Sequence, residues 1–287
     1  MMVIGPEAFG ICRLEASGPP PVATIVAAST LPAAIDTVLP SIAPSLGSGI
    51  RLVLPTRHPS PSTASDLVTP FRSALATAGL TVEVVRPAGL SPRYWSSTGR
   101  ALGEWREVPL APDSLFPRAT LPSRLVDSDN LVLLNDLRDE KELRPVIALG
   151  VWKRYLHPKQ RLLVELASHR TPVDAEIAAV IRPAATVLAA SGNSYALLIF
   201  TADPLAAELI GLAIHWATSF SEAETTGPWE DAIVQRATEL GSEIRLPRDL
   251  SLEWRRAEEP AAPDPELFAS LARRVEQRLG IPSSQIH

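Results

Sequence analysis

The side chains best suited to chemistry follow an apolar run in the middle of the chain. Residues 131–134 are all Leu or Val, which is typical of a buried strand. Asp136, Arg138, Asp139 and Glu140 come directly after it. A charge cluster at the end of a strand indicates either an active site or the remains of one.

Two chemical roles are open to these carboxylates. Asp136 and Glu140 can act as general acid and base, and together with Asp139 they can bind a metal ion. Arg138 can attract an anionic substrate. The alternative is an exposed loop whose basic residues neutralise the carboxylates, and the lack of a matching histidine nearby favours this alternative.

A second candidate site follows residues 49–55, another predicted strand. Arg57 and His58 come directly after it, on the side where open α/β sheets bind ligands. Hydroxyl side chains lie between them and the next helix, so the segment can hold an anion. The alternative is a polar loop whose hydroxyls cap that helix.

Asp203 is the third candidate, at the start of a helix predicted over residues 203–220. With Pro204 in the first helical position, Asp203 is expected to cap the helix, and its place at a helix N-terminus also makes it a catalytic candidate. The basic segment 153–161, which contains His157, indicates a local anion site or a solvated basic face.

Several familiar signatures are absent from the sequence. The strand–helix junctions carry neither a glycine-rich dinucleotide fingerprint nor a P-loop, and no H-E-x-x-H or G-x-S-x-G occurs. The single cysteine, Cys12, cannot form an internal disulfide, a Cys-based zinc site or an iron–sulfur cluster. No iron–sulfur cluster is therefore expected from this chain, and the identity of any other cofactor stays open.

Composition limits the partners. The net charge of −5 gives no reason to expect a nucleic acid or an anionic membrane. No apolar run suits a transmembrane helix and no signal peptide is recognised, so a cytoplasmic location is expected. Many prolines beside few lysines are typical of GC-rich bacterial genomes.

The pattern of elements predicts an α/β fold, with a mainly parallel sheet flanked by helices and a helical C-terminal extension. Strands are expected at 22–29, 49–55 and 80–87, and the helices between them at 30–46 and 62–79, the first kinked or broken by Pro40 and Pro44. Residues 88–123 read as an irregular excursion with one short strand near 104–110. Further elements are expected over residues 131–134, parts of 141–170, 173–183, 185–191, 195–202 and 203–220.

The tail differs in character. Amphipathic helices are expected at 228–241 and 264–280, joined by a charged, proline-rich connector. We therefore expect an α/β domain over residues 1–220 and a helical extension over 221–287 that packs on it. The apolar seam of the last helix docks on the parent domain or forms a homodimer or other partner contact.

Three phrases resemble the domain-of-unknown-function 362 family over about residues 30–215. They are "ALATAGLTVEVV" (74–85), "SDNLVLLNDLRDE" (128–140) with "VIALGVWKRYL" (146–156), and "TADPLAAELIGLAI" (201–214). The resemblance implies an α/β protein of a bacterial or archaeal family that is often joined to ferredoxin-type segments.

The chain departs from the family where the polar signature lies. The positions of the family's Pro-Lys-x-Lys-Thr-His are residues 135–140 here, where Arg138 alone keeps a basic character. Gly150 and Val151 replace a Lys-Asn pair, and Glu208 replaces an aspartate. An anion held by Lys and His would not be held by Asp and Glu. Either the pocket has been abandoned or it serves a cation or another partner.

Three functions follow as hypotheses. The first is a divergent, non-catalytic family member that binds a small molecule or a protein partner. The second is an enzyme with a rebuilt carboxylate site at residues 135–140. The third is an assembly protein that uses the helix over 264–280.

Overall fold

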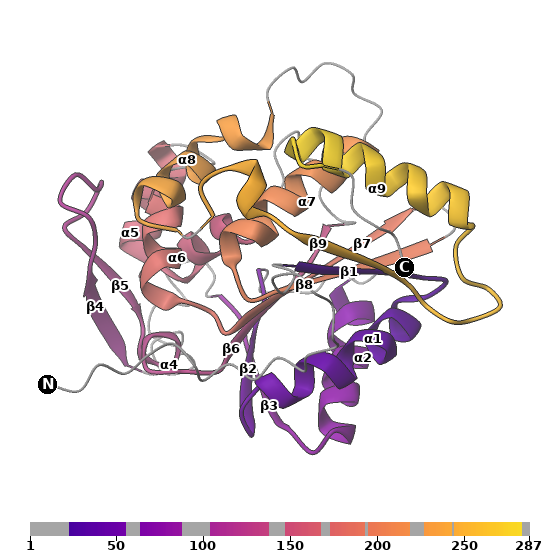
Figure 1. Cartoon of the computed structure of the whole chain (residues 1–287). Helices are drawn as coiled ribbons and strands as arrows, with labels where there is room; N and C mark the ends of the chain where they lie inside the picture. Colours follow the sequence, from indigo (N-terminus) through magenta and orange to yellow (C-terminus); the bar gives the residue numbers. More distant parts are fainter. Residues whose placement is uncertain are drawn as a thin grey trace, which may run out of the picture.

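The computed structural model describes residues 23–55, 64–87, 104–137, 147–167, 173–192, 195–218, 227–242 and 244–282. In these residues a large sheet lies between two layers of helices (Figure 1). The expected α/β class, with a mainly parallel sheet and a C-terminal helix, is confirmed. Among the described helices, none has the length and apolar character needed to cross a bilayer.

Seven strands of the described chain form the large sheet, in the spatial order β3-β2-β6-β7-β8-β1-β9. Only β8 runs against the others, since it is antiparallel to both of its neighbours. The strands are β1 (Ala23–Ala28), β2 (Gly49–Val53), β3 (Thr81–Val85), β6 (Leu131–Asp136), β7 (Ala185–Gly192), β8 (Tyr195–Thr201) and β9 (Leu252–Arg256).

Helices cover both faces of this sheet (Figure 1). The first face carries α1 (Leu31–Ile42) and α2 (Ala64–Thr77). The second face carries η4 (Leu149–Tyr155), α5 (Pro158–Ala167), α6 (Val173–Ile181), α7 (Pro204–Thr218), α8 (Ala232–Glu239) and α9 (Pro265–Leu279). Short pieces complete the described chain: η1 (Ala43–Ser45), α4 (Ser123–Val126), η5 (Pro228–Glu230) and η6 (Pro247–Asp249).

The two layers follow from alternation along the strands. In β1, Ile25 and Ala27 pack on the second face, whereas Val26 and Ala28 pack on the first. A strand buried on both sides needs a continuous apolar sequence, and the apolar run in β6 has the same cause. Burial of each Val, Leu or Ile side chain contributes roughly 1.5–3 kcal/mol.

Helix ends agree with their sequence signals. The carboxylate of Asp264 accepts hydrogen bonds from Glu266 N and Leu267 N at the start of α9, and Gly280 ends the helix in the left-handed region, with φ 69°. Gly79, expected to end α2, also has a positive φ, 82°. A helix is therefore stopped at both points by a residue without a Cβ.

Three details differ from the sequence analysis. Residues 104–122 hold two strands, β4 (Trp105–Pro109) and β5 (Arg118–Pro122), paired as a hairpin. α1 continues through Pro40 and gives way to the 3₁₀ turn of η1 at Pro44. Residues 252–256, read as part of a connector, form β9 beside β1, because Leu252 and Trp254 alternate with polar residues and reach the core.

Candidate functional site

The carboxyl ends of β2 and β6 lie side by side. These strands are parallel neighbours, with Val53 opposite Leu133. The chain leaves β2 for α2 on one face of the sheet, and it leaves β6 toward α6 on the other face. The two connections therefore diverge between these neighbouring strands. Such switch points are where open α/β sheets bind ligands.

Most of the candidates from the sequence lie outside the described residues. Arg57 and His58 fall in residues 56–63, and Arg138, Asp139 and Glu140 fall in residues 138–146. The structure does place the strands from which both segments start, and these are neighbours.

Asp136 and Asn135 end β6 at this edge. Asp136 is 8% exposed and lies opposite Ala189 of β7. Asn135 Oδ1 accepts a hydrogen bond from the Asp136 backbone N–H at 2.9 Å, and Asn135 Nδ2 donates to the carbonyl of Ile147 at 2.8 Å. Asn135 thus fastens the segment before η4 to the end of the strand, and Asp136 is left with little solvent access.

α7 holds the same segment from the other side. Glu208, which is fully buried, accepts hydrogen bonds from the backbone N–H groups of Ala148 and Leu149, both at 2.8 Å. One turn later, a Cβ on Gly211 would collide with Ile147 Cγ2. The carboxylate and the missing side chain therefore form a docking point for residues 147–149.

Asp203 lies at the opposite edge of the sheet from Asp136. Because β8 is antiparallel, its carboxyl end lies at the amino edge of the other strands; Thr201, its last residue, is opposite Ala23. Asp203 Oδ1 accepts hydrogen bonds from Leu205 N at 2.7 Å and from Ala206 N at 3.0 Å, the expected helix cap. The structure therefore does not bring Asp203 together with Asp136.

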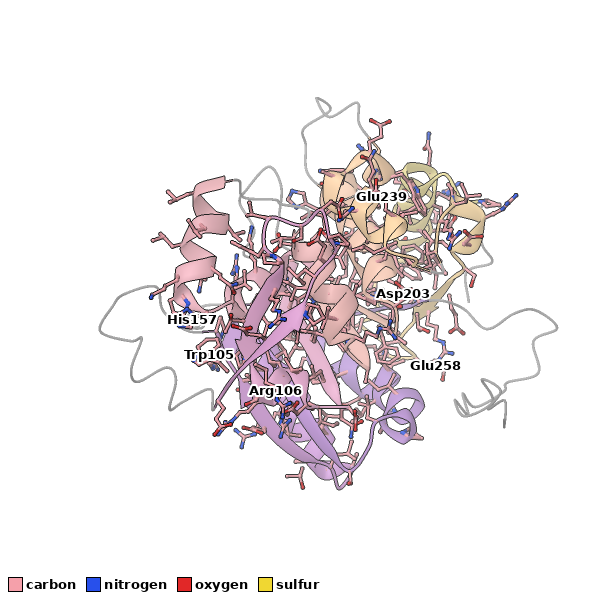
Figure 2. All side chains as sticks on the ribbon, turned by 90° about the vertical axis from the view of Figure 1, so that its left-hand side faces the viewer. Trp105, Arg106, His157, Asp203, Glu239 and Glu258 are labelled. Carbon is pink, nitrogen blue, oxygen red and sulfur yellow. The ribbon has the colours of Figure 1, made fainter. Side chains whose placement is uncertain are left out.

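The basic segment 153–161 is divided among separate contacts. Lys153 turns inward to Asp174, with 3.6 Å between Nζ and Oδ2 and both side chains buried. The ring of His157 packs edge-on against Trp105 of β4, with centroids 5.0 Å apart (Figure 2). Burial, together with the charge of Lys159, holds the pKa of His157 below its usual value.

Tyr155 closes the ends of β2 and β3. Its buried hydroxyl donates to the carbonyl of Leu54 or of Val85, at 2.7 and 2.9 Å, and accepts from Leu54 N at 3.2 Å. Burial raises the pKa of Tyr155, while the hydrogen bond with Leu54 and the charges of Arg86 and Arg154 oppose the rise. Arg154 Nη1 donates to the carbonyl of Pro55 at 2.9 Å.

A groove runs between α2 and β3, and we call it the α2–β3 groove. Its volume is about 460 Å³. Val84 of β3 and Arg86, which directly follows β3, also line it; they are two residues apart and so on the same side of the extended chain. α2 contributes one stripe of its surface: Val68, Thr69, Arg72, Ser73 and Ala76.

Charge in the α2–β3 groove has one sign. Arg72 and Arg86 line it, and the lining residues that the structure describes include no Asp or Glu. Arg86 Nη1 is buried and has no hydrogen-bond partner among the described residues. A guanidinium in this setting offers its N–H groups to an incoming acceptor.

Sequence reasoning missed this groove. Arg86 directly follows the predicted strand 80–87, but a single Arg after a strand is too common to stand out. Arg72 faces outward on an amphipathic helix, where solvated arginines are ordinary. The spacing of Thr69, Arg72, Ser73 and Ala76 does place them on one stripe of the helix. It indicates a binding surface only once β3 is known to lie beside that stripe.

Metal binding is not favoured in the residues that the structure describes. Within them, no three His, Cys, Asp or Glu side chains are grouped so that they could hold one ion. The proposed ligands Asp139 and Glu140 lie outside this part of the chain, so the predicted set with Asp136 stays a prediction.

Comparisons with known proteins do not show a family. No family model matches the chain, and no curated protein matches it. A solved structure titled as an aromatic amino acid aminotransferase with 3-indolebutyric acid aligns with 90% of this chain at 13% identity and a TM-score of 0.27. The alignment spans 57% of that protein's length. At this level of similarity the alignment carries no argument about function.

Proposed function

We propose that this protein is a non-catalytic binding protein for an anionic ligand, which it holds in the α2–β3 groove. The observation that carries the proposal is the pair of guanidinium groups, Arg72 and Arg86, in a groove whose described lining holds no carboxylate. Carboxylates and phosphates match the planar donors of arginine, and two arginines can bind one anion from both sides.

The other lining residues support the same ligand class. Thr69 and Ser73 place hydroxyl groups beside Arg72, while Val68, Ala76 and Val84 supply an apolar surface. A volume of about 460 Å³ lies in the range of small-molecule sites. A ligand with an anionic group and an apolar portion fits this combination.

The carboxyl ends of β2 and β6, near Asp136, are less suited to bind a ligand than the α2–β3 groove. There, Asn135, Glu208 and Tyr155 each hold backbone groups of the fold, which leaves fewer polar atoms for a ligand. An enzyme at residues 135–140 would depend on Asp139 and Glu140. We expect Mg²⁺ and Mn²⁺ to leave the thermal unfolding midpoint unchanged; a bound metal that is lost in Asp136→Asn would favour the enzyme instead.

The hypothesis of an assembly protein depends on an exposed apolar seam on α9. The seam of α9 packs inside the chain, since Leu271, Val275 and Leu279 are at most 1% exposed, and Leu267 alone of the seam is 43% exposed. A helix whose apolar stripe is already buried has little to offer a second copy.

Isothermal titration with glutarate, citrate and inorganic phosphate tests the proposal. Wild-type protein should bind at least one of them, and Arg72→Gln and Arg86→Gln should each weaken that binding by about tenfold, the effect of a lost charged hydrogen bond. Arg273→Gln, on the exposed side of α9, is the matched control. If no anion binds, or if all three variants bind like the wild type, the proposal is wrong.

A further inference from the structure

β3 is the end strand of the large sheet in the described chain, and its outer edge pairs with no described strand. Its inner edge is satisfied: Thr81 N donates to Ser48 O at 3.0 Å, and Val85 O accepts from Leu54 N at 3.1 Å. Because backbone groups alternate along a strand, the N–H and C=O groups of Val82 and Val84 point outward.

One of those residues, Val84, also lines the groove. Val82 and Val84 pack toward α2, on the side where Arg86 lines the groove. The free backbone edge and the groove therefore lie side by side along the same strand. An exposed sheet edge is the arrangement that accepts a peptide by strand addition.

Natural edge strands are usually protected by a charge, a proline or a bulge. β3 has the sequence TVEVV, rich in β-branched residues, and contains no proline or lysine. Its one charge, Glu83, is paired with Arg51 at 3.1 Å and with Arg124 at 2.8 Å. Its negative charge is thereby offset, so it opposes an acidic neighbour only weakly.

Charge selects the occupant. Arg72 and Arg86 flank the groove, and a residue with a carboxylate that enters between them gains charge-assisted hydrogen bonds. The chain as a whole carries −5, so this preference is local and does not come from the overall field. The five residues of β3 offer room for an extended segment of about 17 Å.

We infer that the α2–β3 groove binds an extended acidic segment of a partner protein, which adds to β3 as a further strand. This inference rests on the proposed function, because the same two arginines bind the acidic side chains. Every second side chain of the segment would face the groove. We therefore expect acidic or apolar residues at these alternate positions, whereas the residues between them face away from the groove.

Fluorescence anisotropy with a labelled Val-Glu-Val-Glu-Val-Glu peptide tests the inference. The peptide should bind, and its counterpart with Lys for Glu should bind at least tenfold more weakly. Of two versions N-methylated at alternate residues, one on the Val amides and one on the Glu amides, only one should lose binding, since a single edge of the peptide faces β3.

A variant of the protein separates strand addition from simple charge attraction. Val82→Pro removes an N–H that points outward at a residue that does not line the groove, so the pairing with β2 should survive, as circular dichroism can verify, and peptide binding should fall at least tenfold. Glutarate or phosphate binding should persist in this variant. Peptide binding that is insensitive to Val82→Pro and to both N-methylations would overturn strand addition while leaving anion binding intact. If the wild-type protein binds neither glutarate nor phosphate, both the proposed anion binding and the strand addition are wrong.

Discussion

At the scale of single residues, the buried polar groups near the carboxyl edge serve the fold. Lys153 pairs with Asp174, Asn135 binds the carbonyl of Ile147, and Tyr155 bridges β2 and β3. The sequence marks these positions as polar, but it does not show whether such a side chain points at the backbone or at a ligand. The catalytic cluster expected at residues 135–140 stays a prediction, because residues 138–140 lie outside the described part of the chain.

Lys153→Met should destabilise the protein by about 3–5 kcal/mol, because it leaves the carboxylate of Asp174 buried without its cation. Denaturant unfolding measures the change. Adding Asp174→Asn to the variant should recover a large part of the loss, since the buried charge is then gone. A loss below about 1 kcal/mol in the single variant would contradict the buried ion pair.

His157 should make stability depend on pH. Its pKa in the folded protein is lowered, chiefly by burial, so the unfolded chain binds more protons just below the unfolded pKa of about 6.5. This contribution is complete above about pH 6.5 and is lost as pH falls through the folded pKa.

The free energy of unfolding, measured from pH 8 to pH 5, should therefore fall less steeply in His157→Asn than in the wild type. Taking the difference between the two profiles cancels the carboxylates common to both proteins. Parallel profiles would show that the contact with Trp105 does not favour the neutral ring.

At the scale of elements, α7 is both core and anchor. Its Asp203–Pro204 start was predicted correctly, because capping is local and its signals lie within one turn. The roles of Glu208 and Gly211 were not predicted, because they depend on a segment about 60 residues away in the chain. β9 was missed for a related reason: its partner β1 lies at the other end of the sequence.

Gly211→Ala tests the anchor with two opposing effects. Alanine favours a helix by about 1 kcal/mol over glycine. The new methyl group would collide with Ile147, and such overpacking costs about 1–3 kcal/mol. We expect net destabilisation in thermal or denaturant unfolding.

A second substitution gives the control for this anchor. Ile147→Ala removes the colliding side chain, so the double variant should be more stable than the sum of the two single changes predicts. Simple additivity would mean that Gly211 is not required for the close approach.

At the scale of the whole molecule, the alternation of strands and helices was enough to predict an α/β fold. The spacing of apolar residues within a segment indicates whether that segment is a strand or a helix. The spatial order of the strands, the reversed β8 and the α2–β3 groove could not be predicted, because they arise only when elements distant in sequence meet.

The most direct test is an NMR titration of the ¹⁵N-labelled protein with glutarate. We expect the amide resonances that shift to belong to α2 and to residues 82–86, in and directly after β3, and we expect Arg86→Gln to abolish these shifts. Shifts confined to residues 135–137 and 147–155 would place the ligand at the carboxyl edge near Asp136 and would contradict the account.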